Sequence, residues 1–154
     1  MNFSGNITQV GSRAEAEEAA DAISKNNAAN ILKTTGQHDE AIRLHTEAVE
    51  AKVRIFGERS IHAAISFNGL GETLLEAGRL DEAADAFGKA LKVRDDVAFG
   101  GMGIGPRNDA AASRDNMARV LEARGDFSGA RGMRLKGADK GQTMCGCYDV
   151  SIPR

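Results

Sequence analysis

Two cysteines near the end of the chain, Cys145 and Cys147, are the residues best suited to metal chemistry. A closed zinc site needs four nitrogen or sulfur ligands around one ion. No second cysteine pair accompanies this C-x-C pair, and the histidines stop at His62. A disulfide between residues this close would be strained. We therefore interpret both as free thiols and predict no metal; the alternative is that they open a zinc-binding module of a longer protein.

The three histidines do not form a ligand set. His38 is expected in a turn, His45 on an outer helix and His62 in a linker. His38 and His45 are seven residues apart, and no third ligand stands at a suitable spacing. Histidines in such places are usually solvated or packed against neighbours, and we interpret these three in that way.

Other polar patterns also fail as catalytic sites. The glycine-rich run over residues 100–105 follows a predicted helix rather than a strand and matches neither nucleotide-binding fingerprint. The neighbouring carboxylates Glu17-Glu18 and Asp95-Asp96 diverge on a helix, and no serine is paired with a histidine. The sequence therefore predicts no enzyme activity and no cofactor.

Charge and hydropathy restrict the partners. A formal net charge of −2 gives no electrostatic reason to bind nucleic acid or an anionic membrane. No apolar run approaches the roughly 20 residues that cross a bilayer. The first residues lack the basic and apolar regions of a signal peptide, so we expect a cytoplasmic protein.

The elements that would position any site are helices. Apolar residues recur at helical spacing after a polar leader over residues 1–11, and an irregular tail is expected over residues 139–154. Ser12 and Glu15 have the spacing of a capping box. The predicted helices cover residues 12–34, 39–57, 60–76, 81–98, 108–123 and 128–138. Glycines end three of them (Gly36, Gly78 and Gly125), and we expect the next helices to be capped by Asp39, Asp81 and Ser128.

These helices form an internal repeat. The turn glycines lie 42 and then 47 residues apart, and three columns of small residues keep the same register. Small side chains are needed where helices cross closely. The columns are Ala29, Gly71 and Ala118; Ala41, Ala83 and Ala130; and Ala48, Ala90 and Gly137, with leucine in a further column at Leu32, Leu74 and Leu121.

The repeat resembles the tetratricopeptide repeat, and its 42-residue step is similar to the longer unit of kinesin light chains. The residues that carry the resemblance are Asn26-Asn27-Ala28-Ala29, Gly36 to Ala41, Ile55-Phe56-Gly57, Asn68-Gly69-Leu70-Gly71, Gly78 to Ala83 and Asp115-Asn116-Met117-Ala118. The resemblance implies an all-α fold, a short right-handed superhelical solenoid of about three antiparallel helix–turn–helix repeats. The repeat domain is expected over residues 12–138, with units at about 12–57, 58–99 and 107–138.

The resemblance also implies a function as a non-catalytic module that binds a peptide or partner protein in a concave groove. The groove would be lined by one face of each first helix: Ile23, Asn26, Asn27, Asn30 and Lys33, then Ile65, Asn68, Glu72 and Leu75, then Ala112, Asp115, Arg119 and Glu122. Asparagine suits this role, because its amide can donate to and accept from a peptide backbone; the alternative is that Asn26 and Asn68 satisfy neighbouring helix ends. The carboxylates in this set disfavour binding of an acidic peptide terminus.

Two further readings stay open from the sequence. The chain could be an adaptor or regulatory fragment of a protein whose zinc finger or effector part lies elsewhere, or an enzyme whose site is assembled only by tertiary contacts. The last helix leaves Met133 and Leu135 without a cover. We expect either the tail, including Tyr148 and Ile152, or a second copy in a homodimer to cover them.

Overall fold

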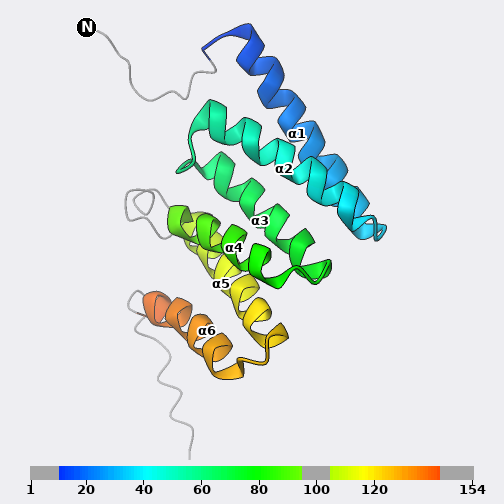
Figure 1. Cartoon of the computed structure of the whole chain (residues 1–154). Helices are drawn as coiled ribbons and strands as arrows, with labels where there is room; N and C mark the ends of the chain where they lie inside the picture. Colours follow the sequence, from blue (N-terminus) through cyan, green and yellow to red (C-terminus); the bar gives the residue numbers. More distant parts are fainter. Residues whose placement is uncertain (1–10, 95–104, 143–154) are drawn as a thin grey trace, which may run out of the picture.

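The computed structural model describes residues 11–94 and 105–142, and over these residues the chain is helical without strands (Figure 1). Each expected helix is present. The bounds are α1 Arg13–Thr34, α2 His38–Phe56, α3 Ile61–Glu76, α4 Leu80–Arg94, α5 Gly105–Ala123 and α6 Phe127–Gln142.

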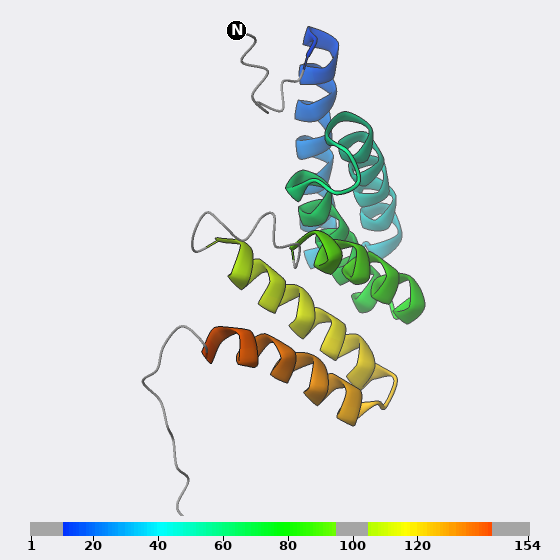
Figure 2. The ribbon, with the colours of Figure 1, turned by 90° about the vertical axis from the view of Figure 1, so that its left-hand side faces the viewer.

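The helices pack as three antiparallel hairpins, α1–α2, α3–α4 and α5–α6, and each hairpin stacks on the next (Figures 1 and 2). The first helices also touch one another, α1 against α3 and α3 against α5. The stack is therefore a short solenoid of helical hairpins with α1, α3 and α5 in one layer.

The small-residue columns lie where the helices cross. Eight of the nine predicted members are buried; the ninth, Gly137, lies outside the residues whose side-chain surroundings the structure describes. Phe87 is the largest fully buried side chain, and a Cβ on Gly71 would lie 2.7 Å from its ring. The close approach of α3 and α4 thus depends on a missing methyl group at position 71.

The turns confirm the predicted helix ends but correct three helix starts. Gly36, Gly78 and Gly125 have φ of 81°, 77° and 83°, the left-handed region that glycine enters without strain. Asp39, Asp81 and Ser128 are not N-caps, because each following helix begins earlier and these residues lie in its first turn. The first helical hydrogen bonds run from Ala41, Ala83 and Ala130 to the carbonyls of Gln37, Arg79 and Asp126. Asp39 and Asp81 still lie in the first turn, at the positive end of the helix dipole.

The structure assigns the cap of α6 to Asp126, whose Oδ1 accepts from the Gly129 N–H at 2.8 Å. We expect Asp126→Ala to lower the free energy of unfolding by about 1 kcal/mol, since an N-cap oxygen satisfies an otherwise open donor. Ser128→Ala is the matched control and should change stability by less than about 0.5 kcal/mol. Chemical denaturation monitored by circular dichroism measures both, and a larger loss for Ser128→Ala would contradict this assignment.

The other caps and helix ends agree with the prediction only in part. Ser12 Oγ accepts from the Glu15 N–H at 3.2 Å, while the Glu15 carboxylate accepts from Gly11, one residue before the expected partner. Helix α5 begins at Gly105, inside the expected loop, because Pro106 costs nothing in a first turn. Helix α6 continues past the expected end at residue 138 to Gln142. None of the described helices is long and apolar enough to cross a membrane.

Candidate functional site

A ladder of polar side chains runs across the first helices of the three hairpins. Lys33 Nζ of α1 donates to Glu72 Oε2 of α3 at 2.9 Å, and this ion pair is half-buried. Asn68 Nδ2, one turn earlier on α3, donates to the other oxygen of the same carboxylate at 2.8 Å. Three of the predicted groove residues are therefore joined directly.

The ladder continues onto α5 through residues that the sequence analysis did not select. Asn116 Nδ2 donates to Asn68 Oδ1 at 3.4 Å and to Glu72 Oε1 at 3.3 Å. Ser113 Oγ donates to Asn68 Oδ1 at 3.3 Å. Arg119, a predicted groove residue, donates to Asn116 Oδ1 at 3.2 Å. Asn116 and Ser113 are buried, so their polar groups need hydrogen-bond partners inside the fold. The helical periodicity of the sequence does not reveal this burial, and the sequence analysis therefore missed both residues.

Three other predicted groove residues contact the second helix of their own hairpin. Asn26 Oδ1 lies 3.2 Å from His45 Nδ1 of α2, and Asp115 Oδ1 accepts from Arg134 Nε of α6 at 2.8 Å. Arg134 also pairs with Glu122. The Asn26–His45 and Asp115–Arg134 contacts each join residues 19 apart at the same place in the repeat, which in the second hairpin holds Asn68 and Phe87.

His45 is wholly buried at this place, so it is a packing histidine rather than a ligand. Because a carbonyl oxygen can only accept, the contact with Asn26 puts the proton on Nδ1. Nε2 is buried without a hydrogen-bond partner among the described residues. Burial, reinforced by the positive charge of Lys33, lowers the pKa of His45 to about 4. The imidazole is therefore neutral over the physiological pH range.

Comparison with known families explains this arrangement. A model of the tetratricopeptide repeat family matches residues 20–96, half of the chain. The chain belongs to the tetratricopeptide repeat family. Membership accounts for the stacked hairpins and the buried small-residue columns, and it indicates a repeat scaffold rather than a catalytic domain.

A solved tetratricopeptide-repeat protein supports the subclass. The crystal structure of BtubC (BKLC) from P. vanneervenii, a kinesin light chain-like protein, matches with a TM-score of 0.73 and 28% identity. The match covers 89% of this chain and 53% of that one, so this chain spans about half the length of its relative. No curated protein sequence matches the chain.

The remaining groove candidates differ in exposure. Ile65 of α3 is 45% exposed, and Ile23 stands one repeat earlier at the same place of α1, 54% exposed. Asn30 is half-buried and Asn27 exposed. Leu75 instead packs against the core cluster around Phe87. An aliphatic pair therefore lies on the same helices as the polar ladder.

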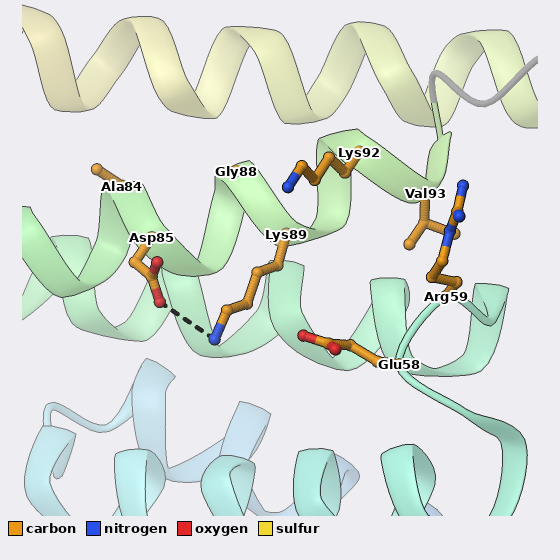
Figure 3. Close-up of a pocket in the computed structure, with 8 residues that line it drawn as sticks. All are labelled: Glu58, Arg59, Ala84, Asp85, Gly88, Lys89, Lys92 and Val93. Carbon is orange, nitrogen blue, oxygen red and sulfur yellow. Dashed lines mark ion pairs between the residues drawn. The ribbon is translucent and has the colours of Figure 1, made fainter.

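A hollow of about 680 Å³ opens on the outer surface of α4, where none of the predicted site residues lies (Figure 3). Lys89 crosses it to pair with Asp85 at 3.3 Å, and its ammonium stands 5.4 Å from the centre of the Phe67 ring. Glu58, Arg59 and Lys92 complete a rim of mixed charge. Because the charges of this rim are mixed, the hollow offers little net attraction to an anionic ligand.

The part of the chain that the structure describes holds no cluster of three potential metal ligands. His62 stacks on Phe56 with ring centres 4.3 Å apart, and His38 lies in the first turn of α2 rather than before it. Cys145 and Cys147 lie outside the described residues, as do Tyr148 and Ile152 of the expected tail. Leu135 is 52% exposed on α6, and its cover by the tail or by a second copy stays a prediction.

Proposed function

We propose that this tetratricopeptide-repeat domain binds an extended peptide segment of a partner protein along the layer formed by α1, α3 and α5. The observation that carries the proposal is the polar ladder from Lys33 through Glu72 and Asn68 to Asn116, which runs across all three first helices. Family membership supports the general role, since repeats of this class serve protein interaction.

The chemistry of the ladder suits a peptide backbone. Amides can donate and accept together, so Asn30 and the second N–H of the Asn68 amide, both on half-buried residues, can bind main-chain groups whatever the peptide sequence. Ile23 and Ile65 stand on the same helices, 54% and 45% exposed, and would supply apolar contacts to alternate side chains of an extended segment. The affinity would thus come from main-chain hydrogen bonds and aliphatic burial.

Charge again disfavours binding of an acidic peptide terminus, but for a different reason from the one that the sequence indicates. Glu72, Asp115 and Glu122 are not free carboxylates, because Lys33 and Arg134 pair with them. The same pairing occupies Lys33 and Arg134, and Arg119 supplies the third positive charge opposite these three carboxylates. The layer is therefore close to electrically neutral, and we expect its peptides to be neutral or of mixed charge.

Selection of peptides from a displayed random library, followed by fluorescence anisotropy with the full chain, tests this proposal. Ile65→Asp, on the proposed layer, should raise the Kd of selected extended peptides by about tenfold or more, because one well-buried aliphatic contact is worth about 1.5–3 kcal/mol. Lys92→Glu on the outer surface of α4 is the control and should leave the Kd unchanged.

Peptides whose binding tolerates Ile65→Asp but fails with Lys92→Glu would place the site on the outer surface and overturn the proposal. A library that yields no binder at all would contradict the proposed function itself. Both variants replace exposed side chains, so loss of fold is readily excluded by circular dichroism.

A further inference from the structure

One interface repeats along the solenoid, between the second helix of a hairpin and the first helix of the next. Three positions of α3 and of α5 face the preceding hairpin in this interface. Gly69 approaches the His45 ring, where an added Cβ would lie 3.0 Å from Cε1, and Ser113 accepts from Arg94 Nη1 at 2.6 Å. The positions are Ser66, Gly69 and Thr73 in α3, and Ser113, Asn116 and Val120 in α5.

The same three positions recur in α1 as Ser24, Asn27 and Ile31, where all three are exposed. Thr73 and Val120 are 0% exposed, whereas Ile31 at the same place is 64% exposed. The first helix therefore carries an interface surface without the helix that covers it in the other two hairpins.

The composition of α1 fits a helix with two packed faces. Its buried residues are alanines, Ala19, Ala22 and Ala29, while its isoleucines at positions 23 and 31 face solvent. Large aliphatic side chains on the exposed face and small ones on the buried face reverse the usual pattern of a surface helix. The described residues bury only a minor part of Ile31, which is therefore suited to burial under another helix.

The repeated interface also specifies the chemistry of that helix. Arg94, in the last turn of α4, donates to Ser113 of α5. Lys52 stands at the same place of α2 and is 7% exposed, but Ser66 Oγ of α3 has no hydrogen-bond partner among the described residues. The corresponding end of α1 is acidic at the surface, with Glu17 and Asp21 held only in exposed pairs within α1. Exposed pairs of this kind contribute little, so their carboxylates stay available to a further cation.

We propose that the exposed face of α1, centred on Ser24, Asn27 and Ile31, is a docking surface for an amphipathic helix of another protein that carries Arg or Lys in its last turn. The helix lies antiparallel to α1, as α2 lies against α3 and α4 against α5. Its basic turn meets Ser24, Asp21 and Glu17, and its apolar side covers Ile31. The last helix of this chain is a poor occupant, because Gly141 stands where α2 has Lys52 and α4 has Arg94.

A stapled, fluorescein-labelled peptide that copies α4, residues 80–94, is the probe. Its staple joins the exposed positions 85 and 89, whose side chains point away from α5 in this structure (Figure 3). We expect saturable binding to the full chain with a Kd below about 100 μM, as for a single helix in a groove of modest area. Ile31→Asp should raise the Kd at least about tenfold, and Arg94→Glu in the peptide should raise it about fivefold.

Ile65→Asp, on an isoleucine of similar exposure in α3, is the matched control and should leave binding of the helical probe unchanged. Absence of saturable binding, or equal binding to the Ile31→Asp variant, would overturn the proposal. Sedimentation that shows a dimer of the chain, lost in Ile31→Asp, would assign the face to a second copy and overturn the assignment to another protein. For extended peptides we expect Ile65→Asp to raise the Kd and Ile31→Asp to leave it unchanged. The two variants therefore distinguish failure of this docking proposal from failure of the proposed peptide-binding function.

Discussion

Phe87→Ala is expected to lower the free energy of unfolding by about 3–5 kcal/mol, the range for removal of a buried aromatic ring. The ring is fully buried in the cluster of Ile42, Leu74 and Val120, which joins all three hairpins. Urea denaturation followed by circular dichroism measures the change. Phe127→Ala in α6 is the control, because Phe127 is 70% exposed and its loss should cost less than about 0.5 kcal/mol.

The contact with Gly71 allows a sharper form of this test. Gly71→Ala alone should destabilise the protein by about 1–3 kcal/mol, since the new Cβ would lie 2.7 Å from the Phe87 ring and force it to move. In the Phe87→Ala background the same substitution should become neutral or stabilising, because alanine is the better helix former. Additive effects of the two changes would contradict the contact.

Acid should weaken the fold through His45. The buried imidazole has a pKa of about 4 in the folded chain, against an ordinary value of 6.5, so the unfolded chain binds the proton more readily. The contribution of the neutral His45 to the free energy of unfolding is fully present above pH 6.5. It decreases by up to about 3 kcal/mol as the pH falls toward 4. Denaturation series between pH 7.5 and 4.5 measure this loss.

His45→Gln is the control, because an amide can keep a hydrogen bond with Asn26 without titrating. The variant should lose stability at neutral pH but should lack the additional fall between pH 6.5 and 4.5. Carboxylates that cations hold at a lowered pKa, such as Glu47 and Glu122, give up stability only below their ordinary value of 4.5. Parallel pH profiles for the variant and the parent chain would show that His45 is not responsible.

The fold could be predicted from the sequence because small residues recur at fixed positions of the repeat. Ala41, Ala83 and Ala130 recur in step, and each is buried at a helix crossing. The helix starts were misplaced because an acidic residue suits both an N-cap and a first turn, and only the hydrogen bonds to Gln37 and Arg79 separate the two.

The candidate site was predictable only in part. Helical spacing puts Lys33, Asn68 and Glu72 on comparable faces, and the structure joins them. The spacing cannot tell that Asp115 turns to Arg134, because that contact depends on how α6 crosses α5. The burial of His45 was likewise hidden, since its place on an outer helix is polar in sequence but enclosed by α1 and α3.

The place that holds His45 and Phe87 in the first two hairpins holds Arg134 in the third, with its side chain 39% exposed. Helix α6 also contains Gly129 and Gly132, which weaken it. In a one-dimensional array a weak terminal pair can detach while the rest stays folded. A ligand that grips α5 would then bind and order α5–α6 in one step, and part of its intrinsic affinity would be consumed by that ordering.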